Sequence, residues 1–375
     1  MKYTTSLSDP WVGYTAAALQ YLCALEAAGH TDIDIDPVGR PFLWSDLPAW
    51  TARLQANRTG APNLHDVNVG HYTPHVLTQM RFRTGRRVNL GLTVTETDPV
   101  PSWIMDAFNR TLDGVICPTQ WQADIYARSG LHIPTYVVPH ALDEYWWRGV
   151  VTTPPPPEGA GPYVFYTTGT WNARKNPIDV LRAYLRGFVN DGTTALALKV
   201  TATMGIEDVI RAVVVAETGS DVRLDPTHGD VWVYAEAWPD RTKMQWLHAH
   251  VGHCYVSAHR GEGWGYGLHE AAAMGRPVIY TSWSAPVEFL DPSTDFPVEY
   301  TLQAVGSQGG DAPYFQSVGA DLMWADPCKD SLIEQMRDAA RRRAVRDTGA
   351  TSRLRAQFAW EAVGAQFSAV VRQHE

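Results

Sequence analysis

The chain has 375 residues, 45% of them hydrophobic, and it carries a formal net charge of −9. That length and composition allow two ordinary domains with full cores and exclude broad disorder. The acidic balance argues against a general binder of nucleic acid or of anionic membrane surfaces. The cysteines lie far apart without a C-x-x-C pair, a spacing that favours a reducing compartment over zinc or disulfides.

The N-terminal residues do not form the long apolar region that a signal peptide needs. The chain also has no apolar run of about 18 residues, the length of a membrane-spanning helix. We therefore expect a cytoplasmic protein without a membrane span.

Short apolar runs alternate with segments of helical periodicity from end to end, which is typical of α/β proteins with parallel sheets. The predicted elements of the first half are a helix at 14–28 closed by Gly29, a strand at 88–95, a helix at 102–109, a strand at 114–117, a helix at 119–129 and a strand at 136–138. Thr119 is expected to cap its helix and Gly130 to end it.

Residues 152–160 contain four consecutive prolines, Pro154–Pro157, which exclude both helix and sheet interior. We interpret them as a linker between an N-terminal domain, 1–151, and a C-terminal domain, 161–354. The predicted elements of the second domain are strands at 163–167, 196–201, 231–233, 251–258 and 277–281, and helices at 177–188, at 240–250 and from Ala271.

The last predicted helix, 354–371, carries an apolar stripe made of Leu354, Phe358, Val363, Phe367, Val370 and Val371. We expect residues 355–375 to pack back on the N-terminal domain.

The most informative segment is 261–270, which reads G-E-G-W-G-Y-G-L-H-E. The carboxylates of Glu262 and Glu270 bracket a run in which every second residue is glycine. Glycine lets the backbone approach a ligand closely, and a helix N-terminus favours anions. This combination suits a nucleoside diphosphate carrying a hydroxyl-rich group. Neither G-x-G-x-x-G nor a P-loop fits the spacing, so a nucleotide-sugar epimerase or dehydrogenase is disfavoured.

The segment also resembles the retaining glycosyltransferases of the GT-B fold, family 4 type. Their pattern runs E-G-F-G, then E-A-M-A, a glycine and P-V-I, and this chain reads E-G-W-G at 262–265 and E-A-A-A-M-G-R-P-V-I at 270–279. A second match is G-T-W-N-A-R-K-N at 169–176, which resembles the family's G-x-x-x-x-R-K-N turn. Its two cations, Arg174 and Lys175, are what a diphosphate leaving group needs.

The resemblance implies two Rossmann-like domains that face each other across a cleft, with the last helix packing back on the first. It implies transfer of a sugar, with retention, from a UDP- or GDP-sugar to a hydroxyl acceptor, without a metal or other cofactor. Arg174 and Lys175 would stabilise the diphosphate, while Glu262 would hold sugar hydroxyls and Glu270 the ribose. The leaving phosphate, rather than a protein nucleophile, would take the acceptor proton. The other implied donor contacts are Gly169, Thr170, Gly263, Trp264, Gly265, Tyr266, Gly267, Leu268, Gly13 and His140.

The first half matches the family less closely. His140 lies in a segment resembling V-V-P-H-G-V-D, although Ala141 replaces the glycine. Glu96 stands where many members carry a histidine against the transferred sugar, so it is a candidate catalytic residue whose role stays open. Gly13 takes the place of the family's first glycine-rich turn. The acceptor candidates are His71, Asp98, Arg81 and Arg83.

Two alternatives stay open. The protein could bind nucleotide sugars without catalysis, or it could be a viral enzyme that glycosylates hydroxymethylated bases in DNA. The arginines at 81, 83, 86 and 87 would favour DNA or a phosphate-bearing acceptor, whereas those between 337 and 355 read as a solvated face. Residues 32–36 contain D-x-D, a metal motif of the GT-A fold, but their alternation also describes an edge strand.

Overall fold

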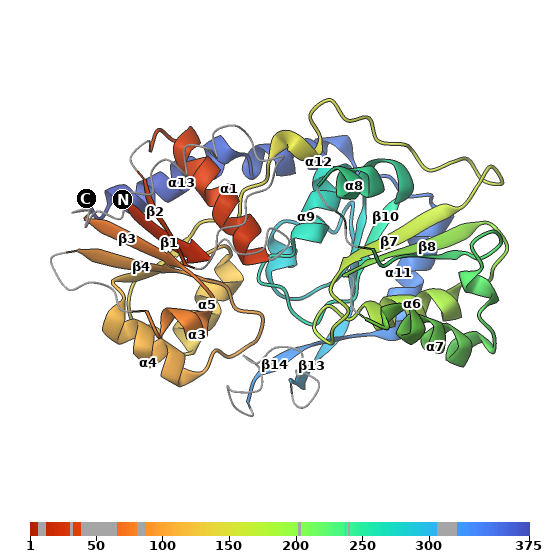
Figure 1. Cartoon of the computed structure of the whole chain (residues 1–375), viewed down its shortest axis with the longest axis horizontal. Helices are drawn as coiled ribbons and strands as arrows, with labels where there is room; N and C mark the ends of the chain where they lie inside the picture. The colour runs from red at the N-terminus through yellow and green to blue at the C-terminus, as the bar shows by residue number, and fades with distance from the viewer. Residues whose placement is uncertain are drawn as a thin grey trace. The chain divides into compact units, whose positions relative to one another are not determined.

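The computed structural model describes residues 1–6, 13–30, 33–38, 66–80, 87–201, 204–236, 238, 241–305 and 321–375. The chain divides into two compact units, unit 1 (Met1–Glu144 with Arg355–Glu375) and unit 2 (Tyr145–Leu354). Each unit is built on a six-stranded sheet with helices packed against it (Figure 1). The predicted α/β class is therefore confirmed.

The sheet of unit 1 has the order β2-β1-β3-β4-β5-β6, and its strands pair in parallel. The strands are β1 (Lys2–Ser6), β2 (Asp34–Val38), β3 (Val67–His71), β4 (Val88–Leu92), β5 (Gly114–Cys117) and β6 (Thr135–Val137), and the helices are α1 (Gly13–Ala27), α3 (Pro74–Leu77), α4 (Ser102–Thr111), α5 (Gln120–Arg128) and α13 (Trp360–Arg372). The order reverses between β1 and β3, as in flavodoxin-like sheets.

The capping prediction for α5 is confirmed. The Thr119 hydroxyl accepts a hydrogen bond from the Gln122 N–H at 3.3 Å, and Gly130 ends the helix with a φ of 98°. Gly29 follows α1 with a φ of 90°, a left-handed conformation that glycine adopts without strain. The strand predicted at 88–95 is shorter, since β4 ends at Leu92.

The C-terminal segment forms two helices rather than the single one predicted. They are α12 (Thr348–Gln357) and α13, separated by Ala359 in an extended conformation. The carbonyl of Phe358 accepts a hydrogen bond from the Leu142 N–H at 2.8 Å, so a contact within unit 1 replaces the continuation of the helix. The predicted apolar stripe is nevertheless buried, and α13 lies along α1 (Figure 1).

Gly364 sets how closely α13 approaches α1. A Cβ atom at this position would lie 1.9 Å from the Ala24 carbonyl oxygen. We expect Gly364→Ala to destabilise the protein by about 1–3 kcal/mol, the usual cost of overpacking. Urea unfolding would measure it, with Gly13→Ala as the control because a Cβ there meets no described atom within 4 Å. Equal stability of both variants would contradict this packing.

The sheet of unit 2 has the order β12-β11-β10-β7-β8-β9, again in parallel. Its strands are β7 (Tyr163–Gly169), β8 (Thr194–Val200), β9 (Val231–Tyr234), β10 (Cys254–Ser257), β11 (Val278–Thr281) and β12 (Phe296–Val298), and its helices are α6 (Pro177–Gly187), α7 (Ile206–Thr218), α8 (Arg241–Trp246), α9 (Tyr266–Ala273) and α11 (Lys329–Arg341). Numbered from β7, this is the Rossmann order, which reverses between β7 and β10. An antiparallel pair, β13 (Tyr300–Ala304) and β14 (Met323–Pro327), completes the unit.

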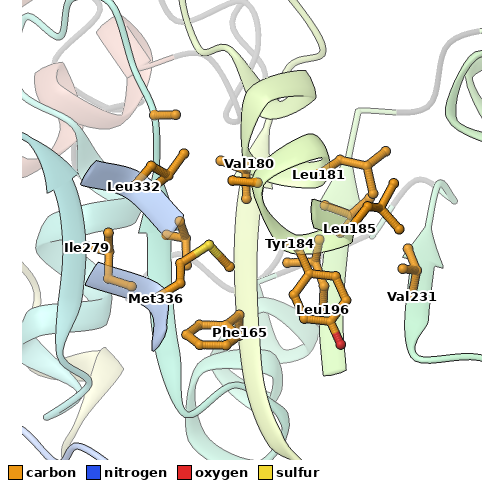
Figure 2. Close-up of a cluster of buried hydrophobic side chains, with 14 of the residues drawn as sticks. Phe165, Val180, Leu181, Tyr184, Leu185, Leu196, Val231, Ile279, Leu332 and Met336 are labelled. Atoms are coloured by element: carbon orange, nitrogen blue, oxygen red, sulfur yellow. The ribbon is translucent and has the colours of Figure 1, made fainter. Parts of the chain in front are cut away.

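The core of unit 2 lies where α6 and α11 pack on the sheet (Figure 2). Phe165 and Leu196 point from the strands toward Val180 and Tyr184 of α6, and Met336 comes from α11; all are fully buried. Every residue of β8 is buried, as expected for a strand covered by helices on both faces. Burial of an apolar side chain of this size stabilises by about 1.5–3 kcal/mol.

Residues 152–160 form neither helix nor strand, as the prolines require. Two backbone hydrogen bonds of Thr153 fix the start of this segment within unit 2. The Thr153 N–H donates to the Ala249 carbonyl at 2.7 Å, and the Thr153 carbonyl accepts from Arg276 Nη1 at 2.8 Å. Across the residues that the structure describes, no helix combines the length and apolar composition that spanning a membrane requires.

Candidate active site

Two loops of unit 2 carry the motifs that the sequence singled out. Residues 170–176 follow β7, and residues 258–265 follow β10. These strands are hydrogen-bonded neighbours on either side of the point where the strand order reverses. In open α/β sheets that point leaves a crevice beyond the carboxyl ends of the strands, where ligands bind. The topology therefore brings both motifs to one place.

The glycine-rich run is partly helical, which corrects the prediction of a helix from Ala271. Helix α9 already begins at Tyr266, and Gly265 precedes it with a φ of 95°. A Cβ on Gly267 would lie 2.5 Å from the Tyr255 hydroxyl oxygen, so the helix can approach β10 only with glycine there. The preceding strand also starts later than predicted, at Cys254, because residues Leu247–Val251 form a π-helical turn.

Glu262 is held by the two cations of the other loop. Lys175 Nζ lies 2.6 Å from Glu262 Oε1 and 2.9 Å from Oε2, and Arg174 Nη1 lies 3.1 Å from Oε2. Arg174 Nη1 also donates to the Gly261 carbonyl at 2.7 Å. The Glu262 side chain is only 4% exposed, so both of its oxygens are engaged in a nearly dry environment.

The charge of Glu262 follows from these neighbours. Burial by itself would raise the pKa of the carboxyl group, but Lys175 and Arg174 outweigh burial and bring the pKa to about 2. A carboxylate with so low a pKa is a weak base. With both oxygens bound to cations it is also a poor nucleophile.

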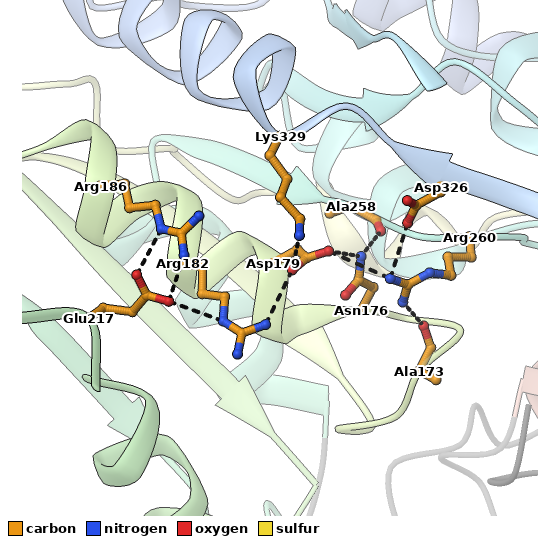
Figure 3. Close-up of polar contacts among 10 residues, drawn as sticks. All are labelled: Ala173, Asn176, Asp179, Arg182, Arg186, Glu217, Ala258, Arg260, Asp326 and Lys329. Atoms are coloured by element: carbon orange, nitrogen blue, oxygen red, sulfur yellow. Dashed lines mark hydrogen bonds and ion pairs between the residues drawn. The ribbon is translucent and has the colours of Figure 1, made fainter. Parts of the chain in front are cut away.

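The loop of Arg174 and Lys175 is fixed by its two asparagines. Asn172 Oδ1 accepts from the Lys175 N–H at 2.8 Å. Asn176 has a φ of 53°, and its amide donates to Asp179 Oδ2 and to the Ala258 carbonyl, each at 3.0 Å (Figure 3). Asparagine tolerates this left-handed conformation better than most residues. Asn176, the last residue of R-K-N, therefore shapes the turn of the loop.

A narrow pocket of about 30 Å³ lies beside the cluster, which exceeds the roughly 10–15 Å³ that one water molecule needs. Its lining includes Gly169, Thr170, Lys175, Glu262, Gly267 and Leu268, all predicted from the sequence. Sequence reasoning missed the other lining residues, which are Thr167, Thr168, Pro177, Lys199, Val200, Tyr255 and Ser257. Most of them lie at or near the carboxyl ends of β7, β8 and β10. In the sequence these residues belong to apolar strand patterns, which do not indicate which single residue faces a pocket.

Glu270 and Trp264 lie apart from this pocket lining. Glu270 is on α9 with 17% of its side chain exposed, and its Oε2 is 3.7 Å from His248 Nε2. The Trp264 ring packs on Phe289 at 4.9 Å between centroids and donates to His269 Nδ1 at 3.0 Å. This indole is therefore part of the core of unit 2 rather than of the pocket. Gly263 is buried in the same loop, and Tyr266 is half-buried.

The predicted histidines of unit 1 are buried. His71 ends β3, and its Nδ1 is 2.8 Å from the Tyr3 hydroxyl; burial lowers the pKa of His71 to about 3. His140 Nδ1 is 2.8 Å from the Tyr21 hydroxyl. Both imidazoles are bonded to tyrosines inside the unit.

The remaining candidates of unit 1 lie nearer its surface. Glu96 is half-buried in the segment after β4, and Asp98 pairs with exposed Arg128 at 2.8 Å. Gly13 is exposed as the first residue of α1. Arg81 and Arg83 lie outside the described residues.

The acidic and basic clusters have structural explanations where they are described. Strand β2, which contains Asp34, is the edge strand of its sheet, but Asp34 is buried rather than solvated. Among the described residues, no group of three or more His, Cys, Asp or Glu side chains could hold a metal ion. The late arginines are largely paired: Arg341 and Arg342 contact Asp338, and buried Arg346 binds Asp295 at 2.8 Å.

No protein-family model matches the chain, and no curated protein sequence matches it. Solved structures do match. Sucrose-phosphate synthase from Thermosynechococcus elongatus has a TM-score of 0.66 at 13% identity, covering 99% of this chain and 98% of that one. For the lipopolysaccharide outer core galactosyltransferase WaaB the values are 0.64 and 12%, with 100% of both chains covered.

A third structure, Anabaena Alr3699/HepE in complex with UDP and glucose, has a TM-score of 0.59 at 12% identity and covers 99% of both chains. Likeness at such identities establishes the fold. The chain has the GT-B fold over its whole length, as the motif resemblance implied.

Proposed function

We propose that the protein is a glycosyltransferase that moves a sugar from a UDP- or GDP-sugar to a hydroxyl acceptor. The observation that carries the proposal is buried Glu262, clamped by Lys175 and Arg174 beside a pocket at the switch point of the unit 2 sheet. A structure of the same fold, Anabaena Alr3699/HepE, holds UDP and glucose, which supports a nucleotide-sugar donor here.

The proposed roles follow from where charge develops. Cleavage of the sugar–phosphate bond places negative charge on the departing diphosphate, and Arg174 and Lys175 stabilise it. As those cations turn to the diphosphate, Glu262 becomes available to accept hydrogen bonds from sugar hydroxyls. Lys175 is 30% exposed and Arg174 17% exposed, so both side chains reach solvent while Glu262 stays buried.

We also propose that transfer retains the anomeric configuration and needs no metal ion. The E-x7-E spacing of Glu262 and Glu270 supports retention by its resemblance to the retaining transferases. The proposed role of Glu262 is to accept hydrogen bonds from sugar hydroxyls, which leaves the departing phosphate rather than this carboxylate to act on the acceptor. The two cations supply the positive charge that the diphosphate requires. Proton NMR of the product's anomeric centre would test retention, and inversion would contradict it.

Glu270→Ala tests the proposed contact between the protein and the ribose of the donor. If Glu270 accepts hydrogen bonds from the ribose, its loss should weaken UDP or GDP binding about tenfold, the equivalent of one hydrogen bond to a charged group. The measurement is the rise in melting temperature on adding either nucleotide. Glu207→Ala, an exposed acid on α7, is the matched control. Equal shifts in wild type and Glu270→Ala would remove Glu270 from the site.

The two alternative functions are a DNA-modifying glycosyltransferase and a non-catalytic nucleotide-sugar binding protein. The DNA-modifying alternative depended on the arginines at 81, 83, 86 and 87, of which the first three lie outside the described residues, so it stays a sequence prediction. A non-catalytic binding protein would keep the same clamp and differ only in forming no product.

A further inference from the structure

Arg260 joins the loop of Glu262 to the loop of Arg174 and Lys175. Its backbone N–H donates to the Arg174 carbonyl at 2.7 Å, and its Nη1 donates to the Ala173 carbonyl at 2.6 Å. One residue therefore holds two successive carbonyls of the cation-bearing loop. Arg260 itself does not line the pocket beside Glu262.

Arg260 is in turn fixed from the opposite side. Its Nη2 lies 3.3 Å from Asp326 Oδ1 on β14 and 3.6 Å from Asp179 Oδ2 on α6, as Figure 3 shows. Its carbonyl accepts from the Ala325 N–H at 2.8 Å. The Arg260 side chain is only 10% exposed, and the two carboxylates compensate its buried charge. Its Nη1 and Nη2 groups are engaged, whereas Nε has no hydrogen-bond partner among the described residues. The planar fork thus has one orientation, set by two carboxylates and one carbonyl.

We propose that Arg260 is a positioning residue that aims Arg174 and Lys175 at the diphosphate of the donor. The inference rests on the proposed function and deepens it, because it assigns Arg260 to binding of the donor's diphosphate and not to binding of its nucleoside. Without the Arg260 fork, the Ala173 carbonyl loses its anchor, while the Arg174 carbonyl keeps its hydrogen bond from the Arg260 N–H. The two cations that follow Ala173 then lose part of their orientation. Nucleoside binding does not depend on those cations.

The test compares ligands with and without the diphosphate. Isothermal titration calorimetry would measure UDP against uridine, and GDP against guanosine, for wild type and Arg260→Met. We expect the diphosphate to bind about tenfold more weakly to the variant, as for one lost charge-assisted hydrogen bond, and the nucleoside to bind equally to both proteins. Arg260→Lys should restore binding only in part, since an ammonium group cannot reach the carbonyl and both carboxylates as a fork does.

A double-mutant cycle shows whether Arg260 acts through Lys175. In a Lys175→Ala background, Arg260→Met should cause clearly less further loss of diphosphate binding than it causes alone. Asp326→Asn is the variant least able to disturb folding, because Asp326 is 40% exposed; it should weaken diphosphate binding less than Arg260→Met does. Arg186→Gln is the control, since Arg186 lies in the neighbouring polar network, bonds Glu217 and is 51% exposed.

The outcomes separate the two proposals. Unchanged UDP and GDP affinity in Arg260→Met, or an equal loss for nucleoside and diphosphate, would overturn the positioning role. So would an additive double mutant. If wild type binds neither UDP nor GDP, the proposed function itself fails, and this inference fails with it.

Discussion

Lys175→Ala is expected to lower kcat/KM for sugar transfer by about 10²–10³-fold, the usual cost of removing one donor from a developing anion. Lys175 makes the shortest contact with Glu262, 2.6 Å, and it lines the pocket beside Glu262. Its loss also leaves buried Glu262 with Arg174 as its ion-pair partner among the described residues. The variant thus loses one cation that stabilises the leaving group. It also loses one of the two cations that neutralise buried Glu262.

The control for this prediction is Lys243→Ala, because Lys243 is an exposed lysine of α8 in the same unit. Its transfer rate should match that of wild type. Circular dichroism would confirm that both variants fold. A Lys175→Ala enzyme with a rate within threefold of wild type, about 0.7 kcal/mol of barrier, would contradict the assignment of Lys175 to the leaving group.

Acid is expected to destabilise the protein well above the pKa of its carboxylates. Burial lowers the pKa of His71 to about 3, of His259 to about 4 and of His269 to about 3. The unfolded chain binds protons at these histidines below a pH of about 6.5, whereas the folded protein does not until pH 3–4. Stability therefore falls as the pH drops through this window, by about 2 kcal/mol for each histidine at pH 5. For a fold stabilised by about 5–15 kcal/mol, the combined loss is large.

His259→Phe isolates one of these contributions. Among the described residues neither ring nitrogen of His259 has a hydrogen-bond partner, so an apolar ring of similar shape should not destabilise the protein at pH 8. Urea unfolding between pH 8 and pH 5 should then show a shallower loss of stability for His259→Phe than for wild type. His132→Phe, at an exposed position, should leave the slope unchanged. Identical slopes in all three proteins would contradict the burial of a neutral His259.

The overall α/β class could be predicted from the sequence because its signals are local. Buried parallel strands such as Gly114–Cys117 read as apolar runs, and Thr119 and Gly130 show where α5 begins and ends. The errors arose where a longer-range contact decided the structure. The final helix is interrupted at Ala359, where the Phe358 carbonyl accepts a hydrogen bond from the Leu142 N–H. Helix α9 includes Gly267, at which a side chain would clash with Tyr255 of β10.

The same distinction applies to the site. Arg174, Lys175 and Glu262 stand in dense motifs, so the sequence singles out each of them as a candidate. It does not show that Lys175 and Arg174 hold Glu262 directly. That pairing depends on β7 and β10 being neighbours, which is a property of the topology. Arg260 lies two residues before Glu262 and has no motif of its own, since its role is carried by backbone carbonyls and by Asp326. Sequence patterns do not show such contacts.

The most direct test of sugar transfer is a mass-spectrometric screen of nucleotide sugars incubated with the purified protein and a panel of hydroxyl acceptors. The proposed function predicts that wild type consumes at least one UDP- or GDP-sugar and releases the matching diphosphate, while Lys175→Ala does so at most one-hundredth as fast. A wild-type protein that binds UDP or GDP but leaves every nucleotide sugar intact would contradict it and identify a non-catalytic binding protein.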